Sequence, residues 1–306
     1  MNKRKIMLVF GTRPEAIKMA PLVHALKAEP DKFESKVCVT SQHREMLDQV
    51  LDIFNIKPDI DLNLMKKDQN LSNLTSLILN EMQKVFTKYQ PDIVLVHGDT
   101  TTTLATSIAA FYESIPVGHV EAGLRTNNLK APFPEEFNRQ ITGKIAKWHF
   151  TPTTLTQKNL ISEGVEKSSI IVTGNTVIDA LHLILTRIDK DKHRQKNLKD
   201  FLNAILSFNW KNENFVLVTA HRRENFGDGF LQICSALKEL ALNYPTIHFV
   251  YPVHLNPNVS KIVYEILKGI NNIHLIKPLE YEPFIYLLKH SYLVLTDSGG
   301  IQEEAP

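Results

Sequence analysis

Short apolar runs alternate along the chain with longer segments in which apolar residues recur every three or four positions. The short runs lie at residues 6–10, 33–40, 93–96, 170–172, 215–219, 248–252, 273–276 and 292–296. The intervening segments have helical spacing, which is clearest at residues 71–89. Strands that alternate with helices in this way are typical of βαβ units, so we predict an α/β fold built on parallel sheets.

The alternation occurs in two series, which predicts two domains. A turn at Gly174 and Asn175 follows the run at 170–172, and a charged helix separates it from the run at 215–219. A chain of 306 residues is long enough for two domains of ordinary size. We therefore predict two Rossmann-like, doubly wound domains at residues 1–173 and 174–306, with a ligand site in a cleft between them.

Composition and charge narrow the class of protein. With 35 Lys and Arg against 33 Asp and Glu, the net charge of +2 gives no reason to expect nucleic acid or a membrane as a partner. No apolar run reaches membrane-spanning length, and Cys38 and Cys234 lie in apolar stretches where a buried thiol is expected instead of a disulfide. We expect a cytoplasmic protein.

Acidic residues follow two neighbouring apolar runs and begin the next helix. Asp99 and Glu121 come directly after runs, and Glu135 and Glu136 follow Pro134. Ligands of open parallel sheets bind outside the carboxyl ends of the strands, so this segment predicts one wall of an active site.

Each acidic residue also has an ordinary structural interpretation. Asp99 suits a helix cap, and at least one of Glu135 and Glu136 is better explained as a cap or as a partner of the helix dipole. Glu121 is harder to explain in this way, although Arg125 is near enough in sequence to pair with it.

A glycine turn after the first run suits an anion. Gly11 leads into a helix with free backbone N–H groups at its start, and Arg13 and Lys18 add cations, a combination that fits phosphate or carboxylate. A tight turn with exposed charges is the equally good alternative.

The second series repeats this chemistry at two strand ends. His221 follows the run at 215–219 beside two arginines, a combination that suits a diphosphate, although Glu224 offers one arginine a salt bridge instead. Ser298, Gly299 and Gly300 follow the run at 292–296 and form a possible anion nest.

Several motifs are absent from the sequence. It contains no G-x-G-x-x-G fingerprint, no phosphate loop of the form G-x-x-x-x-G-K-[ST], no H-E-x-x-H and no paired-cysteine motif. We therefore predict neither a nicotinamide cofactor nor a metal.

Long motifs, in order along nearly the whole chain, resemble the bacterial non-hydrolysing UDP-N-acetylglucosamine 2-epimerases. They read VFGTRPEAIKMAPLVHAL, SQHREMLDQVLDIF, VLVHGDTTTTLATSIAAFY, PVGHVEAGLRT, PEEFNRQ, TGNTVIDAL, VTAHRRENFG, YPVHLNPNV and LTDSGGIQEEAP. The resemblance implies the GT-B architecture, in which two Rossmann-like domains face each other across a UDP-sugar cleft. Relatives continue beyond Pro306, so we expect the second domain to be incomplete in this chain.

The resemblance also implies roles for individual residues. The positions that match the active site of the family are Arg13, Lys18, Asp99, Glu121, Glu135 and His221. Those that match its uridine diphosphate side are Phe284, Ser298, Gly299, Gly300 and Glu304. Gln42 and His43 match a region that binds a second, activating substrate molecule in bacterial members.

The implied reaction is reversible inversion at C2 of UDP-N-acetylglucosamine, by elimination of UDP to 2-acetamidoglucal and readdition. No cofactor is expected. The expected partners are UDP-N-acetylglucosamine and UDP, in a homodimer that serves cell-envelope polysaccharide synthesis. The alternatives are a chain with impaired catalysis that only binds the UDP-sugar, a hydrolysing 2-epimerase and a GT-B glycosyltransferase.

Overall fold

The chain forms two compact units in the computed structural model, which describes residues 3–40, 44–64, 69–220 and 227–305. Contacts within the chain divide it into Met1–Ala180 and Leu181–Pro306. Each unit has its own parallel sheet, as the two series of apolar runs predict. The division falls inside a helix, whereas the sequence suggests a boundary just before it at residue 173.

The first unit contains a seven-stranded sheet in the order β3-β2-β1-β4-β5-β6-β7. Every neighbouring pair is parallel, with Val9 of β1 opposite Cys38 of β2 and Met7 of β1 opposite Val94 of β4. The strands are β1 (Arg4–Phe10), β2 (Phe33–Val39), β3 (Ile60–Asp61), β4 (Ile93–His97), β5 (Val117–Val120), β6 (Trp148–Thr151) and β7 (Ile170–Val172).

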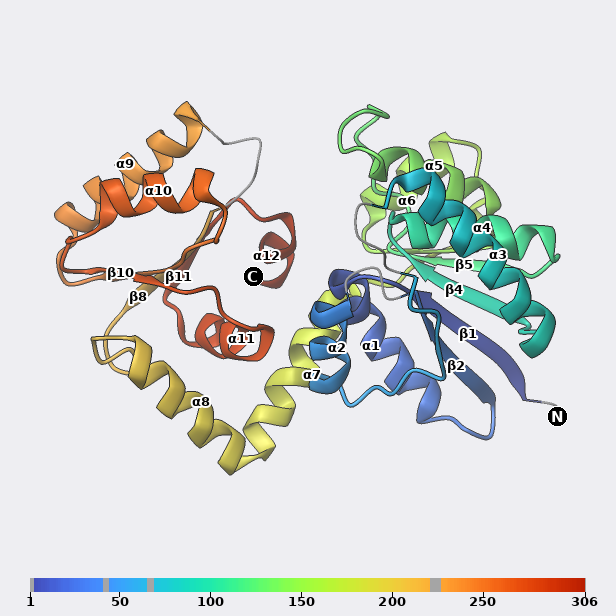
Figure 1. Ribbon diagram of the computed structural model, residues 1–306, viewed down its shortest axis with the longest axis horizontal. Coiled ribbons are helices and arrows are strands. Elements are labelled where there is room, and N and C mark those ends of the chain that lie inside the picture. Colours follow the sequence, from blue (N-terminus) through green and yellow to red (C-terminus); the bar gives the residue numbers. More distant parts are fainter. Residues whose placement is uncertain (1–2, 41–43, 65–68, 221–226, 306) are drawn as a thin grey trace. The chain divides into compact units, whose positions relative to one another are not determined.

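Helices cover both faces of this sheet, with α1 and α2 on one side and α3, α4 and α5 on the other (Figure 1). The apolar stripe of α3, including Ile78 and Met82, packs on Met7 and Val94 of the sheet. This burial fixes the faces of the strands and therefore the edge at which their polar ends emerge. The helices are α1 (Arg13–Lys27), α2 (Arg44–Ile53), α3 (Leu71–Tyr89), α4 (Thr101–Tyr112), α5 (Glu135–Ile145), α6 (Thr154–Ser162) and α7 (Thr176–Lys190).

The second unit contains a four-stranded parallel sheet in the order β10-β9-β8-β11. Its strands are β8 (Phe215–Thr219), β9 (His248–Pro252), β10 (Ile273–Ile276) and β11 (Leu293–Thr296). Helices α9 (Asp228–Asn243) and α10 (Pro257–Leu267) lie on one face, and α8 (Lys192–Ile205) and α11 (Tyr281–His290) on the other (Figure 1). A short helix, α12 (Gly299–Glu304), follows β11.

Each sheet has a point where the direction of strand order reverses. In the first unit β1 lies between β2 and β4, and in the second β8 lies between β9 and β11. Ligands of such sheets bind in the crevice at the carboxyl ends of the two strands that flank this reversal. A ligand is therefore expected at the turns after β1 and β4 in the first unit, and at those after β8 and β11 in the second.

The apolar pattern locates most elements, but it misses two strands and a helix in the first unit. β3 is only two residues long, and one of them is an aspartate. β6 has the sequence WHFT and α6 the sequence TLTQKNLIS, which are too polar to stand out as an apolar run or an amphipathic stripe.

Cys38 and Cys234 are buried free thiols, which confirms their expected place in the core. Among the described residues, no helix combines the length and apolar character needed to cross a membrane.

Candidate active site

Glu121 lies just past β5 and forms an ion pair with a lysine from α1. The Nζ atom of Lys18 donates to Glu121 Oε2, and both side chains are largely buried, at 15% and 11% exposed. The two residues are 103 positions apart in sequence, and the packing of α1 against the sheet brings them together. The expected pairing of Glu121 with Arg125 is wrong, because Arg125 binds Glu163 through two hydrogen bonds of 2.6 and 2.9 Å.

The surroundings of Glu121 keep its carboxylate ionised. Burial alone raises its pKa, but His97 and Lys18 oppose this effect and bring the pKa down to about 2. The backbone of Glu121 has φ of 62°, in the left-handed region that residues with a side chain avoid. Such a conformation persists where the surrounding structure enforces it, and it is commonest at functional sites.

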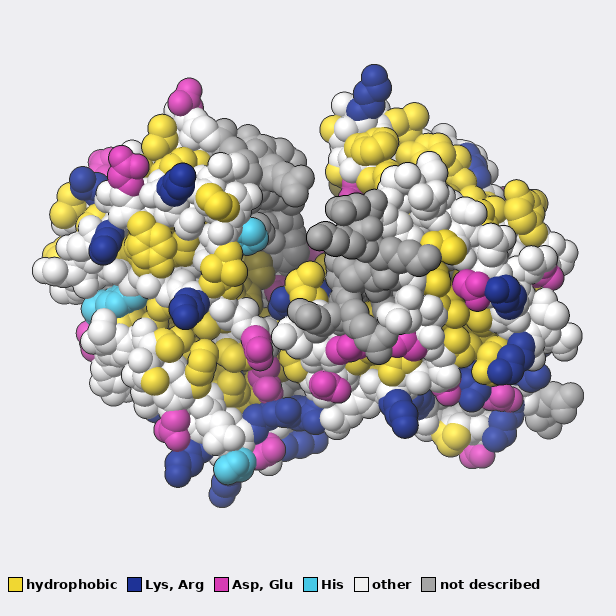
Figure 2. Space-filling view, viewed as in Figure 1, with side chains coloured by type: hydrophobic (Ala, Val, Ile, Leu, Met, Phe, Trp, Pro, Cys, Tyr) yellow, Lys and Arg dark blue, Asp and Glu magenta, His cyan; other side chains and the backbone are white. Residues whose placement is uncertain are grey.

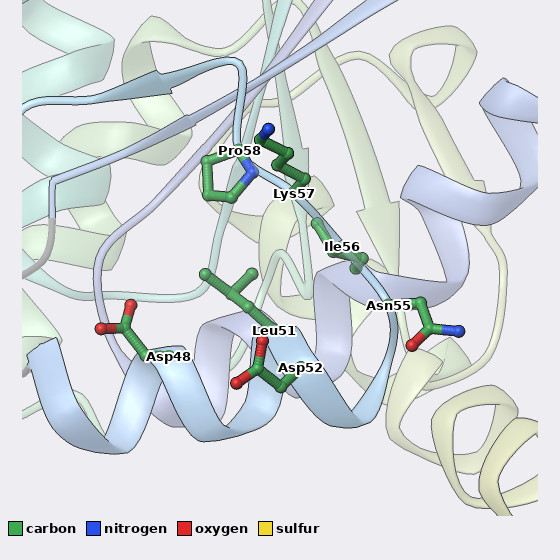
Figure 3. A pocket seen from close by; sticks show the side chains of 7 residues that line it. All are labelled: Asp48, Leu51, Asp52, Asn55, Ile56, Lys57 and Pro58. Carbon is green, nitrogen blue, oxygen red and sulfur yellow. The ribbon is translucent and has the colours of Figure 1, made fainter.

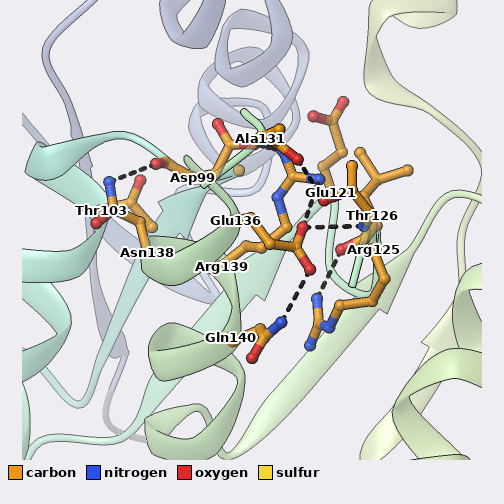
Figure 4. Close-up of polar contacts among 12 residues, drawn as sticks. Asp99, Thr103, Glu121, Arg125, Thr126, Ala131, Glu136, Asn138, Arg139 and Gln140 are labelled. Atoms are coloured by element: carbon orange, nitrogen blue, oxygen red, sulfur yellow. Dashed lines mark hydrogen bonds and ion pairs between the residues drawn. The ribbon is translucent and has the colours of Figure 1, made fainter. Parts of the chain in front are cut away.

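Asp99 lies beyond β4 and is held by two residues of α5. Nη2 of Arg139 donates to Asp99 Oδ2, and Nδ2 of Asn138 donates to the Asp99 backbone oxygen over 2.8 Å (Figure 4). Burial raises the pKa of Asp99, Arg139 lowers it and the negative charge of Glu121 raises it again, with a net shift upward. Asp99 and Glu121 thus have pKa values displaced in opposite directions, an arrangement suited to acid–base chemistry.

The adjacent residues Glu135 and Glu136 have different environments. Glu136 is fully buried and accepts hydrogen bonds from the backbone N–H groups of Thr126 and Asn127 and from Gln140, over 2.9 to 3.1 Å (Figure 4). Burial raises its pKa, but these hydrogen bonds outweigh burial and leave the pKa below its ordinary value. Glu136 is therefore the structural member of the pair, which confirms the expectation that one of the two glutamates has such a role.

Glu135 begins α5 and has a less complete set of contacts. Its Oε2 atom is buried and has no hydrogen-bond partner among the described residues. A buried carboxylate oxygen without a donor is unusual, because most buried polar atoms are paired. Glu135 thus remains a candidate for contact with a ligand.

Glu15 joins the turns that follow β1 and β4. Its Oε2 accepts hydrogen bonds from the backbone N–H groups of Gly11 and Thr12 over 3.0 and 2.8 Å. Its Oε1 accepts from the hydroxyls of Thr100 and Thr103 over 2.7 and 3.3 Å. The N–H groups of Gly11 and Thr12, which precede α1, are therefore occupied within the chain.

The start of α4 is capped by a threonine. The hydroxyl of Thr100 accepts a hydrogen bond from the Thr103 backbone N–H over 3.1 Å. Asp99 is thus not the cap, and the expectation of that role is wrong. Its carboxylate is directed to Arg139 instead.

The remaining predicted residues of the first unit fall into two groups. Arg13 is the first residue of α1 and is half-buried. Gln42 and His43 lie outside the described residues, as does His221 of the second unit.

A separate hollow beside α2 is lined by Leu51, Asp52 and residues of the following segment, and none of the predicted site residues lines it (Figure 3).

Four of the predicted residues of the second unit lie on α12 or directly before it, and a fifth lies on α11. Ser298 precedes α12 without a side-chain capping bond, and Gly299 and Gly300 form its first turn. Glu304 ends this helix, whereas Phe284 lies on α11 and is half-buried. The ends of β8 and β11 are joined by a 2.6 Å hydrogen bond from the Thr219 hydroxyl to that of Thr296.

Known proteins with similar sequences identify the family of this chain. Residues 24–306 match the family model for UDP-N-acetylglucosamine 2-epimerase. The UDP-N-acetylglucosamine 2-epimerase of Yersinia pestis is 58% identical over 305 residues, which cover 99% of this chain and 79% of that protein. The chain belongs to the UDP-N-acetylglucosamine 2-epimerase family. The family member of Escherichia coli K12 is 56% identical, with 99% of this chain and 79% of that protein covered.

A solved structure of this epimerase family has the same fold. The Neisseria meningitidis enzyme, bound to UDP-GlcNAc, is 52% identical and superposes with a TM-score of 0.88. The match covers 99% of this chain and 80% of that one. This agreement confirms the predicted GT-B-like class with two parallel-sheet units.

Sequence reasoning missed three residues of this site. Glu15 could have been found from the sequence, because Thr12 and Glu15 have the spacing of a capping box. The structure contains this capping box. Arg139 stands three positions after Glu136 on α5, yet its contact with Asp99 depends on the packing of α5 beside α4. In the sequence, His97 looks only like the last residue of an apolar strand.

Among the described residues, no group of three or more His, Cys, Asp or Glu side chains is arranged to hold a metal ion.

Proposed function

We propose that this chain interconverts UDP-N-acetylglucosamine and UDP-N-acetylmannosamine by inverting C2 of the sugar, without a cofactor. The observation that carries the proposal is the placement of Asp99 and Glu121 just past neighbouring strands of the sheet, each held by a cation of a different helix, with pKa values displaced in opposite directions. Such a pair can remove and return a proton. The activity named for the relatives of Yersinia pestis and Escherichia coli supports the same substrate.

The chemistry explains why carboxylates and cations are both needed. No carbonyl lies next to C2, so a proton cannot simply be removed there. If the C1–O bond to UDP breaks, positive charge develops at C1 and makes the C2 proton acidic. Loss of that proton gives 2-acetamidoglucal and UDP, and readdition of UDP at C1 with a proton on the opposite face of C2 gives the epimer.

The proposed sugar-side residues are Asp99, Glu121 and Glu135. Glu121 is ionised, because His97 and Lys18 outweigh the effect of burial on its pKa. An ionised carboxylate suits stabilisation of positive charge at C1 or acceptance of the C2 proton. The raised pKa of Asp99 suits a group that carries a proton and returns it. Glu135, with its buried unpaired Oε2 among the described residues, is proposed to contact the sugar directly.

The proposed nucleotide-side residues bind the diphosphate and uridine. They are Arg13, His221, Phe284, Ser298, Gly299, Gly300 and Glu304, while Lys18 is proposed to bind substrate beside Glu121. Cations and helix-start amides stabilise the charge that UDP gains as it leaves. Gln42 and His43 are proposed to bind a second, activating substrate molecule.

We further propose a homodimer in the cytoplasm. Hydrophobic side chains gather on the surface of the first unit near α3, α4 and α5 (Figure 2). They include Leu71, Phe133 and Phe137, which are 41%, 68% and 44% exposed. Surfaces of this kind commonly bind another protein.

The free thiols of Cys38 and Cys234 are consistent with the proposed cytoplasmic location, which is a reducing compartment.

The deciding experiment incubates the purified chain with UDP-N-acetylglucosamine in deuterated water and follows the sugar by NMR. We expect the manno epimer to form, with deuterium at C2 in the product and in recovered substrate. Epimer formation without deuterium would exclude elimination. The absence of any epimer would overturn the function itself, and free N-acetylmannosamine would instead identify a hydrolysing enzyme.

A further inference from the structure

His97 is the last residue of β4, and its imidazole is enclosed beside Glu121. The side chain is 5% exposed, and its Nε2 atom lies 3.6 Å from Glu121 Oε2. Nε2 has no hydrogen-bond partner among the described residues. A buried polar nitrogen without a partner costs free energy of folding, so its position next to a carboxylate calls for an explanation.

The backbone around His97 is fixed from two sides. The hydroxyl of Thr103 in α4 donates to the His97 backbone oxygen over 2.5 Å, and Val120 of β5 lies opposite His97 in the sheet. A ring nitrogen of His119 is 2.8 Å from the backbone oxygen of Gly98. The imidazole of His97 therefore projects from a rigid part of the sheet instead of a loop.

The carboxylate of Glu121 is held close to the same strand end. Its Oε1 lies within 3.7 Å of where a side chain at Gly98 would begin, so the carboxylate packs over this glycine. Its Oε2 already accepts from Lys18. A separation of 3.6 Å to His97 is longer than a hydrogen bond, but contacts of this kind tighten when substrate binds.

We propose that His97 is a positioning residue for Glu121. Its Nε2 donates to Glu121 Oε2 in the substrate complex and, together with Lys18, holds the carboxylate ionised and correctly oriented. With Oε2 occupied by two donors, Oε1 is the oxygen presented to the sugar. This role rests on the proposed epimerase function.

Electrostatic effects on Glu121 agree with this geometry. Burial raises its pKa, and His97 is the largest of the effects that lower it, ahead of Lys18. Two other groups interact with this site: Asp99 after β4, which faces Arg139 of α5, and His119 of β5. Lys18, Asp99 and Arg139 all remain when His97 is replaced, so a changed pH profile reports the loss of the imidazole.

The test compares His97→Leu with His97→Gln. In His97→Leu we expect kcat to fall by about tenfold or more, with KM within about threefold and the acid limb of the kcat profile moved to higher pH. In His97→Gln the amide nitrogen replaces Nε2 as the donor but carries no charge, so we expect kcat within about threefold of wild type and a pH profile between those of wild type and His97→Leu. Equal losses in both variants, or superimposable pH profiles, would overturn the proposal.

His149→Leu is the matched control. His149 is also a buried histidine of the same sheet, at 2% exposed, and its Nδ1 likewise has no hydrogen-bond partner among the described residues. The same loss of a buried imidazole there is expected to reduce stability without moving the pH profile. If His149→Leu moves the profile as far as His97→Leu, the effect is one of packing and the proposal fails.

A measurement that needs no turnover separates this inference from the proposed function. In protein labelled with ¹³C at the glutamate carboxyls, the resonance of Glu121 is assigned by its loss in Glu121→Gln and is then titrated. We expect Glu121 of the wild type to stay ionised down to the lowest pH at which the protein is folded, and to titrate at a higher pH in His97→Leu; identical titration in the two proteins would refute the inference even in an inactive chain. If His97→Leu does not fold, His97→Asn replaces it, because its amide ends one atom short of Nε2. Absence of epimer from the wild type would refute only the proposed function.

Discussion

The carboxyl edges of the two sheets are built differently. At the edge of the seven-stranded sheet, Glu15, Glu121 and Glu136 are enclosed and accept hydrogen bonds from donors on other elements. At the edge of the four-stranded sheet, Ser298 starts a six-residue helix without a side-chain cap. The first edge has its charges positioned in advance, as acid–base chemistry requires, whereas the described turn after β11 in the second presents mainly backbone and small side chains. The following predictions test this contrast.

The largest effect is expected from Glu121→Gln, which removes one charge at the preorganised edge. We expect kcat to fall by about 10²–10⁴, because an acid–base or electrostatic group of the proposed reaction is lost. The protein should still fold, since the amide has the same shape, but the thermal midpoint should fall because Lys18 loses its charged partner. Epimer formation by NMR and thermal unfolding measure the two effects. Near-normal turnover would mean that Glu121 is structural.

Glu136→Gln is expected to have the opposite effect, a large loss of stability with a smaller loss of turnover. An amide nitrogen cannot accept from the Thr126 or Asn127 backbone, and the charge near Arg139 is lost, so the free energy of unfolding should fall by about 2–3 kcal/mol. Urea unfolding measures this change. Glu135→Gln is the control, since Glu135 Oε2 has no partner among the described residues to lose. Equal destabilisation by the two variants would contradict the division of roles between these neighbours.

Acid is expected to weaken the first unit through its buried histidines. Burial lowers the pKa of His119 to about 3, despite the hydrogen bond to Gly98. The unfolded chain, with a histidine pKa of about 6.5, therefore binds more protons between these values, and stability present above about 6.5 is lost as pH falls towards 3. From pH 7 to pH 5 we expect about 2 kcal/mol of this loss. Urea unfolding at both values should show a smaller pH effect in His119→Gln; an identical slope would rule out His119 as the source.

The smallest effect compares the helix starts of the two edges. Thr100 caps α4 and donates to Glu15, so Thr100→Ala should cost about 1 kcal/mol of unfolding free energy. Ser298 makes no side-chain capping bond, so Ser298→Ala should cost less than about 0.5 kcal/mol. Its main effect should be on UDP affinity, measured by calorimetry. A larger loss of stability in Ser298→Ala than in Thr100→Ala would reverse the contrast.

The sequence predicts the fold well because each buried strand needs an apolar run and each covering helix an apolar stripe. Strands such as β4 and β8 were readable for this reason. β6 was not, since alternate positions of WHFT are polar and its burial comes from neighbours on both sides.

The site was predictable in its positions but not in its pairings. Asp99 and Glu121 follow strands that reach the same edge, and this placement follows from the topology of parallel sheets. Which cation meets which carboxylate depends on contacts between distant segments. Arg125 looks close to Glu121 in sequence, yet it binds Glu163, while Glu121 binds Lys18. Local sequence carries no signal for such choices.

The contacts of Glu15 also constrain how this chain can change through evolution. One carboxylate satisfies the turn after β1 and, through Thr100 and Thr103, the turn after β4. A substitution at any of these positions alters both turns at once. We therefore expect positions 15, 100 and 103 to covary among homologues, so that the two motifs, more than 80 residues apart, are inherited as a single unit.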